Sequence, residues 1–305
     1  MWVLAAPRDV LAHLRPLVRA HERTREVRIL EVGGPGALGE ALCGADGVLV
    51  IGDRRRSPRT SLPGPFLDDA TGRAVPAGWL PDLGEGLAAF ARAAARVERR
   101  EGPAGPLAVL GQRERRYLRL AGRMEAKVGR SGAHRLPLLR WTAERLTRDD
   151  LVRGLRLGIG VAVYFGHGRP SGWAAYHGLR AGHLTDVPGE PIGALLSVTC
   201  LTASRHRVGL SFSELVVAGG AAAAAVGAVG EVAHLDNMRW MLGLAAALRD
   251  GEQRLGPALL AAAPADTGLH TPYRIIGDPL ARLVGTAEGA RRAARVFAPA
   301  PEYAA

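Results

Sequence analysis

Short apolar segments alternate with helical patterns along most of this chain, and this alternation strongly limits the possible folds. Two segments, Ile159–Phe165 and Ile192–Val198, carry no charge and have the length of strands buried on both faces. Further strand-like runs occur at Trp2–Ala6, Val27–Val32 and Val48–Gly52, with helical periodicity between them. We therefore predict an α/β fold with mostly parallel sheets flanked by helices.

A Pro- and Gly-rich segment at residues 101–106 is the best candidate for a boundary within the chain. Strand and helix patterns occur on both sides of it. We predict an amino-terminal α/β unit over residues 1–104, a second α/β unit over residues 105–287, and a polar tail over residues 288–305.

The formal net charge of +11 raises the question of nucleic-acid binding. Lys127 is the only lysine, the arginines are spread along the chain, and no basic run interleaves with aromatic residues. We predict no specific nucleic-acid binding. No segment approaches the roughly 18–20 consecutive apolar residues of a membrane span. The first residues lack the basic region of a secretory signal, so we expect a cytoplasmic protein without membrane contact.

The two cysteines, Cys43 and Cys200, are too few for a disulfide framework or a cysteine-rich zinc site. We expect Cys43 to lie in a helix over residues 37–43 as an inert packing residue. Four histidines are candidate metal ligands: His177, His183, His206 and His234. They lack the spacing of a helix-borne zinc site, so we predict no metal, and we also predict no cofactor.

The two residues whose side chains suit catalysis, His167 and Cys200, follow the two buried strands. His167 comes two residues after Phe165, and Cys200 comes two residues after Val198. Because the carboxyl ends of parallel strands meet at one edge of a sheet, both side chains are predicted to face one site. A thiolate is a strong nucleophile, and an imidazole can protonate a leaving amine. In the alternative interpretation, Cys200 is a small buried hydrophobe and His167 is a turn residue.

Several motifs around these residues resemble those of gingipain-type cysteine peptidases. The histidine segment reads YFGHG at Tyr164–Gly168 and is followed by Trp173, and the cysteine segment reads CLTA at Cys200–Ala203. The separation of His167 and Cys200 by 33 residues is also similar to that family. The weaker similarities lie at Gly47–Asp53, Ser213–Leu215, Gly219–Gly227 and Tyr273–Pro279.

This resemblance implies a caspase-like fold in two subdomains, of which only the second is catalytic. It also implies a protein or peptide substrate, with Cys200 attacking the scissile carbonyl and His167 protonating the leaving group. The backbone N–H groups of Gly168 and Cys200 would then form the oxyanion hole. The chain departs from the family at Ser204–His206, where a phenylalanine is often found, and no third, acidic catalytic residue is assigned.

In related peptidases, a loop after the strand beyond the nucleophile helps to build the substrate pocket. The corresponding loop here is Glu231–Asn237, which leads to Trp240. The predicted pocket, which favours cleavage after a basic residue, contains Trp173, Glu231, His234, Asp236 and Trp240. In the alternative interpretation, the loop is only solvated and Trp240 is a core residue.

Two other functions remain open. In the first alternative, the chain is a catalytically silent caspase-like scaffold or binding module. In the second, it is a nucleotide-dependent enzyme, because Gly34–Gly39 matches the dinucleotide-binding glycine pattern and Asp53 follows at the end of the next strand.

Overall fold

The computed structural model describes residues 1–31, 38–52, 62, 64–102, 106–129, 137–263 and 271–286. The strands in these ranges are β1 Trp2–Ala6, β2 Val27–Glu31, β3 Gly47–Gly52, β4 Phe66–Asp68, β5 Ala74–Pro81, β6 Leu107–Gly111, β7 Leu138–Arg140, β8 Val161–Phe165, β9 Gly168–Arg169, β10 Gly172–Trp173, β11 Ile192–Val198, β12 Ala222–Ala228 and β13 Tyr273–Gly277. The helices and 3-10 turns are η1 Arg8–Val10, α1 Leu11–Glu22, η3 Glu40–Leu42, η4 Gly84–Gly86, α2 Leu87–Glu98, α3 Arg115–Gly129, α4 Arg148–Leu155, α5 Ala175–Gly178, α6 Ala181–Thr185, α7 Phe212–Ala218, α8 His234–Arg249 and α9 Leu255–Ala262.

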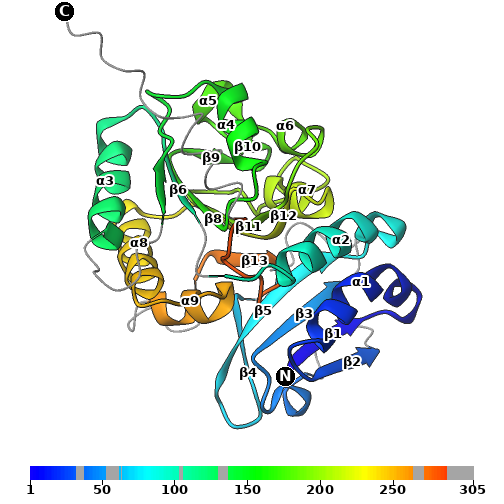
Figure 1. Ribbon diagram of the computed structural model, residues 1–305. Coiled ribbons are helices and arrows are strands. Elements are labelled where there is room, and N and C mark those ends of the chain that lie inside the picture. Colours follow the sequence, from blue (N-terminus) through cyan, green and yellow to red (C-terminus); the bar gives the residue numbers. More distant parts are fainter. Residues whose placement is uncertain are drawn as a thin grey trace, which may run out of the picture.

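Within the described residues, eleven strands form one sheet (Figure 1). Ten follow the order β2-β1-β3-β5-β13-β12-β11-β8-β6-β7, and β4 pairs with β5 beside this path. The pairings of β12 with β13 and of β4 with β5 are antiparallel, and the others in this sheet are parallel. Helices α1, α2 and α7 lie on one side of the sheet and α3, α8 and α9 on the other (Figure 1). The predicted mostly parallel sheet with flanking helices is confirmed.

Strand β13 has a special place in this sheet because it comes from the end of the described chain. It lies between β5 and β12, so strands from both predicted α/β units belong to one continuous sheet. The predicted boundary between residues 104 and 105 and the tail over 288–305 fall outside the described residues, and the division into two units stays a prediction.

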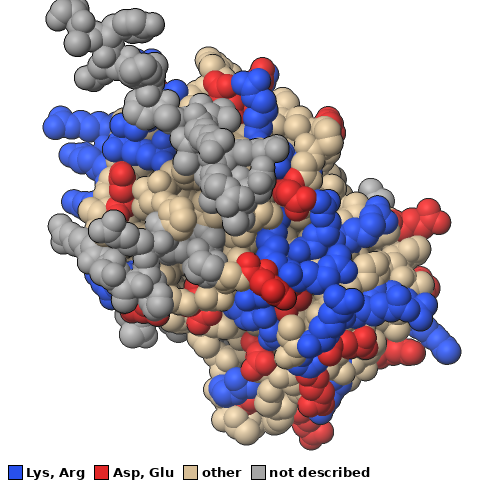
Figure 2. All heavy atoms as spheres, viewed as in Figure 1, with Lys and Arg blue, Asp and Glu red and all other residues tan. Residues whose placement is uncertain are grey.

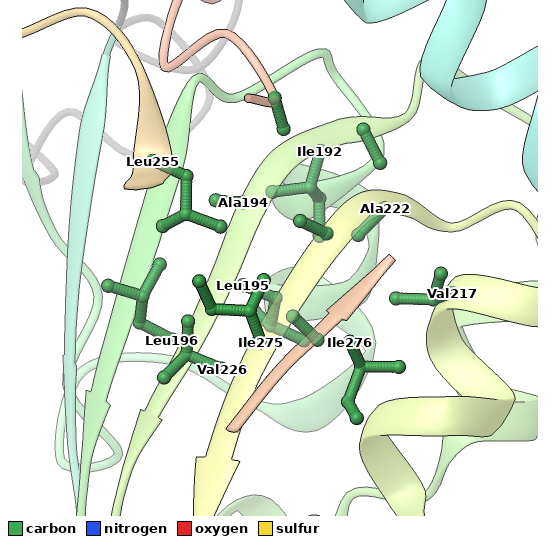
Figure 3. Packing of buried hydrophobic residues seen from close by; sticks show 14 of the residues in the cluster. Ile192, Ala194, Leu195, Leu196, Val217, Ala222, Val226, Leu255, Ile275 and Ile276 are labelled. Carbon is green, nitrogen blue, oxygen red and sulfur yellow. The ribbon is translucent and has the colours of Figure 1, made fainter. Parts of the chain in front are cut away.

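The core explains why β11 has such an apolar sequence. All seven residues of β11 are buried, because helices cover both faces of the sheet. In the register of the sheet, Leu196 lies beside Val226 of β12, which pairs with Ile275 of β13 (Figure 3). Leu195 points to the opposite face, the side of Ile276. The continuous apolar run therefore reflects burial on two faces rather than one.

The sequence signals that begin helices had mixed success. Helix α4 begins at a local signal in the sequence, because its N-cap residue Thr147 accepts a hydrogen bond from the backbone N–H of Asp150 at 3.2 Å. The prediction of a helix over residues 37–43 was wrong for its described part, which forms only the 3-10 turn Glu40–Leu42. Cys43 is exposed at the end of this turn, so the expectation of a packed cysteine was also wrong.

Some predictions fall on residues that the structure does not describe, and others are tested only within the described residues. The Gly34–Gly39 turn, except for its last two residues, and Asp53 lie outside those residues. In the part that the structure describes, no helix has both the length and the hydropathy needed to cross a bilayer. That same part contains no group of three histidine, cysteine or acidic residues arranged to hold a metal ion. The cytoplasmic location stays a prediction.

Candidate active site

The register of the sheet places the two predicted reactive residues at matching positions. Phe165 of β8 pairs with Val198 of β11, and His167 and Cys200 each follow two residues later. The connecting loops touch, since the Thr199 hydroxyl donates a hydrogen bond to the Gly166 carbonyl at 2.6 Å. A Cβ atom on Gly168 would lie 2.3 Å from the Cys200 carbonyl oxygen, so only glycine allows this approach of the two backbones.

Hydrogen bonds hold the backbone of His167 at both its N–H and its carbonyl group. Its N–H donates to Gln112 Oε1 at 2.8 Å, and Gln112 directly follows β6, the strand beside β8. Its carbonyl accepts from the Tyr164 hydroxyl at 3.2 Å and from the Ala174 N–H at 3.0 Å. The imidazole remains 52 % exposed. The protein thus fixes the position of His167 while leaving its ring accessible to a substrate.

Three residues from the β6–α3 segment surround this imidazole, and the sequence analysis predicted none of them. Arg116 Nη2 lies 2.7 Å from Nε2 of His167, and Glu114 Oε1 lies 3.6 Å from the same nitrogen. The Tyr117 hydroxyl lies 3.5 Å from Nδ1 and 3.4 Å from Nε2. Because a guanidinium can only donate, Nε2 accepts in this arrangement and the ring proton is assigned to Nδ1.

Tyr117 connects the environment of the imidazole with that of the thiol. Burial raises the pKa of the Tyr117 phenol, the positive charge of Arg116 lowers it, and the negative charges that Glu114 and Cys200 can carry raise it. Tyr117 thus contacts the imidazole directly, and the strand register brings Cys200 to the same edge of the sheet.

The sulfur of Cys200 is covered on one side by the loop after β12. The backbone N–H of Val232 points to Cys200 Sγ at 3.4 Å, and the Leu201 N–H donates to the Gly230 carbonyl at 3.1 Å. Leu201 has a φ of +63°, in the left-handed region that non-glycine residues rarely adopt. Cys200 is half-buried and therefore has one open side.

The predicted pocket residues fall into two groups. Glu231 and His234 are exposed and Asp236 is half-buried, all beside the Val232 loop that covers Cys200. Trp240 is 6 % exposed and packs edge-on against Tyr273, with ring centroids 5.7 Å apart.

Trp173 lies deeper than the other predicted pocket residues. It is 1 % exposed, and its Nε1 donates to the Ser197 hydroxyl at 2.8 Å. Its ring stacks on Tyr164, the residue that holds the His167 carbonyl. Trp173 therefore supports the His167 loop from within the core.

Comparisons with known proteins identify the family and the fold. Residues 122–284, more than half of the chain, match the sequence model of peptidase family C25. No curated protein matches the chain.

Among solved structures, the Arg-specific cysteine proteinase gingipain R is similar at a TM-score of 0.71 and 13 % identity, covering 94 % of this chain and 78 % of that chain. The complex of the pro- and mature domains from Porphyromonas gingivalis gives a TM-score of 0.69 at 14 % identity, with 92 % and 79 % covered. The separase–securin complex of Saccharomyces cerevisiae gives 0.50 at 10 % identity, with 76 % and 15 % covered. At such low identities the similarity shows a shared caspase-like fold. The chain belongs to peptidase family C25, the gingipain family of cysteine peptidases.

Proposed function

We propose that this cysteine peptidase is an endopeptidase that hydrolyses peptide bonds through His167 and Cys200. The main support is the register of β8 and β11, which puts the two residues at matching positions beyond paired strand ends. Neighbouring parallel strands that end together present their following residues to a common ligand. A half-buried thiol and an exposed imidazole at that edge suit nucleophilic attack and proton transfer.

The reaction begins with attack of the Cys200 thiolate on the carbonyl carbon of the scissile bond. The carbonyl electrons move onto oxygen, where the N–H groups of Gly168 and Cys200 stabilise the charge. When the tetrahedral intermediate collapses, the C–N bond breaks and His167 gives a proton to the leaving amine. Water then attacks the thioester, His167 takes its proton, and the acid product leaves as Cys200 is regenerated.

The surroundings supply two further functions in this scheme. The Val232 N–H, 3.4 Å from Cys200 Sγ, is placed to donate a hydrogen bond to the sulfur during the reaction. Glu114, which also accepts from Gln112 Nε2 at 2.8 Å, is the acidic group that orients and stabilises the protonated imidazole. For Nε2 to carry a proton, Arg116 must first leave it.

Cleavage after a basic residue is the specificity that we propose for the pocket. Val232 contacts the Cys200 sulfur, and Glu231 and Asp236 stand before and after Val232 in the same segment of the chain. Their carboxylates can attract an arginine or lysine side chain of a bound substrate. The similarity to gingipain R, an Arg-specific cysteine proteinase, supports the same preference.

A mixed peptide library tests the proposal. The wild type should generate new carboxyl termini that end mainly in arginine or lysine, as identified by mass spectrometry. Cys200→Ala should remove this activity, and Cys43→Ala, which changes the other cysteine, should leave it intact. Internal cleavage that persists in Cys200→Ala would contradict the assignment, and cleavage after other residues would contradict only the basic preference.

A further inference from the structure

Helix α3 carries a regular basic stripe on its exposed face. Arg115, Arg119, Arg123 and Lys127 recur every four residues, the spacing that brings helical side chains onto one face. The three arginines are exposed and Lys127 is half-buried. At a rise of 1.5 Å per residue the stripe is roughly 18 Å long. Figure 2 shows basic side chains gathered over α3 at the left edge of the molecule.

The three arginines have no carboxylate partner among the described residues. Arg123 Nη1 contacts the sulfur of Met238 at 3.2 Å. Glu125, the acidic residue within α3, pairs instead with Arg140 of β7 at 3.6 Å. Like charges at this spacing repel each other, so the stripe destabilises its own helix. An acidic partner would turn this repulsion into attraction.

The stripe begins at the candidate active site. Arg116, next to its first member, contacts His167 Nε2, and the Tyr117 ring lies 5.4 Å from the imidazole centroid. Tyr117 is also 6.5 Å from the ring of His234, the first residue of α8, and α3 packs against α8. A chain that leaves the site along α3 therefore meets the basic face directly.

We propose that the substrate carries an acidic segment beside the scissile bond and that α3 binds it. This inference rests on the proposed endopeptidase function and adds a substrate class to it. An extended peptide advances about 3.3 Å per residue, so five or six residues span the stripe. The carboxylate nearest the cut pairs with Arg116, which draws the guanidinium away from His167 Nε2 and frees that nitrogen for a proton.

A peptide fits this surface better than a nucleic acid. Single-stranded nucleic acids need exposed aromatic rings on which bases can stack. The aromatic residue of α3 is Tyr117, which is only 6 % exposed and faces the His167 site. Carboxylate groups need only the guanidinium groups that the stripe offers.

The test compares three proteins with peptides that share one cleavable centre and differ in an acidic, uncharged or basic flank. The proteins are the wild type, the stripe variant Arg115→Gln/Arg119→Gln/Arg123→Gln, and the control variant Arg15→Gln/Arg19→Gln/Arg23→Gln. The control removes the same charge from two exposed arginines of α1 and its exposed C-cap residue Arg23, across the sheet from α3 (Figure 1). We expect the wild type to prefer the acidic flank in kcat/KM about tenfold, the stripe variant to lose this preference, and the control to keep it. Added salt should weaken the preference.

A binding measurement separates the surface from the catalysis. Fluorescence anisotropy follows an acidic decapeptide on the Cys200→Ala protein with and without the stripe substitutions. If the stripe variant binds the decapeptide about tenfold more weakly, the proposal is supported even when the wild type cleaves no peptide. In that case the missing cleavage counts against the endopeptidase function alone. Equal binding by both proteins would overturn the proposal. Tighter binding of a single-stranded oligonucleotide of equal charge would overturn it in favour of a nucleic-acid surface.

Discussion

Two histidines of this protein have carboxylates nearby, yet they lie in opposite environments. His21 of α1 is fully buried, stacks on Trp2 at 4.2 Å, and places Nε2 3.0 Å from Asp278 and Nδ1 3.8 Å from Glu98. His167 is 52 % exposed, and its carboxylate neighbour, Glu114, lies 3.6 Å away. The first ring is enclosed by its partners, and the second is open on one side.

The difference in burial separates a structural histidine from the one that we propose for catalysis. Glu98 is also bound by Arg254 at 2.9 Å, so the cluster around His21 joins α1, α2, the start of α9 and the segment after β13. A buried network of this kind stabilises only when all its members are present. The His167 ring has polar neighbours on one side and is half exposed on the other, while its backbone is fixed, and this combination suits proton transfer to a bound substrate.

The largest expected effect tests the chemical side of the comparison. His167→Gln should lower kcat/KM for peptide cleavage by about 10²–10⁴-fold, because the leaving amine loses its proton donor. The free energy of unfolding should change little, since the ring is half exposed. Steady-state kinetics and urea denaturation of the same sample check both statements. A variant that keeps its activity would remove His167 from the mechanism.

The structural side of the comparison predicts the reverse pattern for the other histidine. His21→Gln should lower the free energy of unfolding by about 3–5 kcal/mol, because it leaves Asp278 buried without its partner. Activity per folded molecule should stay near that of the wild type at a temperature where the variant is folded. A urea titration measures the loss, and a stability within 1 kcal/mol of the wild type would show that the network is dispensable.

Acid should weaken this same network. Burial alone would raise the pKa of Asp278, but the attraction to His21 and the hydrogen bonds to His21 and the Leu280 N–H outweigh it and lower that pKa. A lowered folded-state pKa adds stability above the unfolded value near 4, and this stability is lost as the pH falls through the folded value. The stability difference between wild type and Asp278→Asn should therefore shrink below about pH 4. Urea titrations from pH 6 to pH 3 measure it, and a constant difference would contradict the assignment.

A smaller effect is expected where a second residue positions His167. Gln112→Ala removes the acceptor for the His167 N–H and the donor to Glu114, so kcat should fall about tenfold. KM should change less, because the side chain supports the imidazole rather than the substrate. Separate kcat and KM values test this assignment. A rise in KM at constant kcat would instead place Gln112 in substrate binding.

The sequence predicted those parts of the fold that depend on local patterns. Strand β11 has the predicted bounds because its continuous apolar run reflects burial on both faces. Strand β5 was missed, since Pro76, Gly78 and Pro81 are typical of a loop. The structure explains Gly78: a Cβ there would lie 2.0 Å from the Gly277 carbonyl oxygen of β13. That requirement arises from a contact between strands almost 200 residues apart and has no local signal.

The site divides in the same way. His167 and Cys200 were predicted from the sequence because each follows a recognisable buried strand, and the structure places them at matching positions beyond paired strands. The sequence analysis missed the three residues around the imidazole: Glu114, Arg116 and Tyr117. They lie near His167 because β6 is next to β8, and local sequence patterns do not predict the order of strands in a sheet. The charged sequence at the start of α3 was the available signal, and it resembles any solvated helix end.

The most direct test of the central claim is the rate at which a peptidyl electrophile with arginine next to its reactive group modifies the two cysteines. Mass spectrometry of the digested protein measures Cys43 and Cys200 in one reaction, and the exposed Cys43 serves as the internal reference. The account predicts that Cys200 reacts about a hundredfold faster than Cys43 and loses most of this advantage in His167→Gln. Equal rates at the two cysteines, or an advantage that survives His167→Gln, would contradict the pairing of His167 with Cys200.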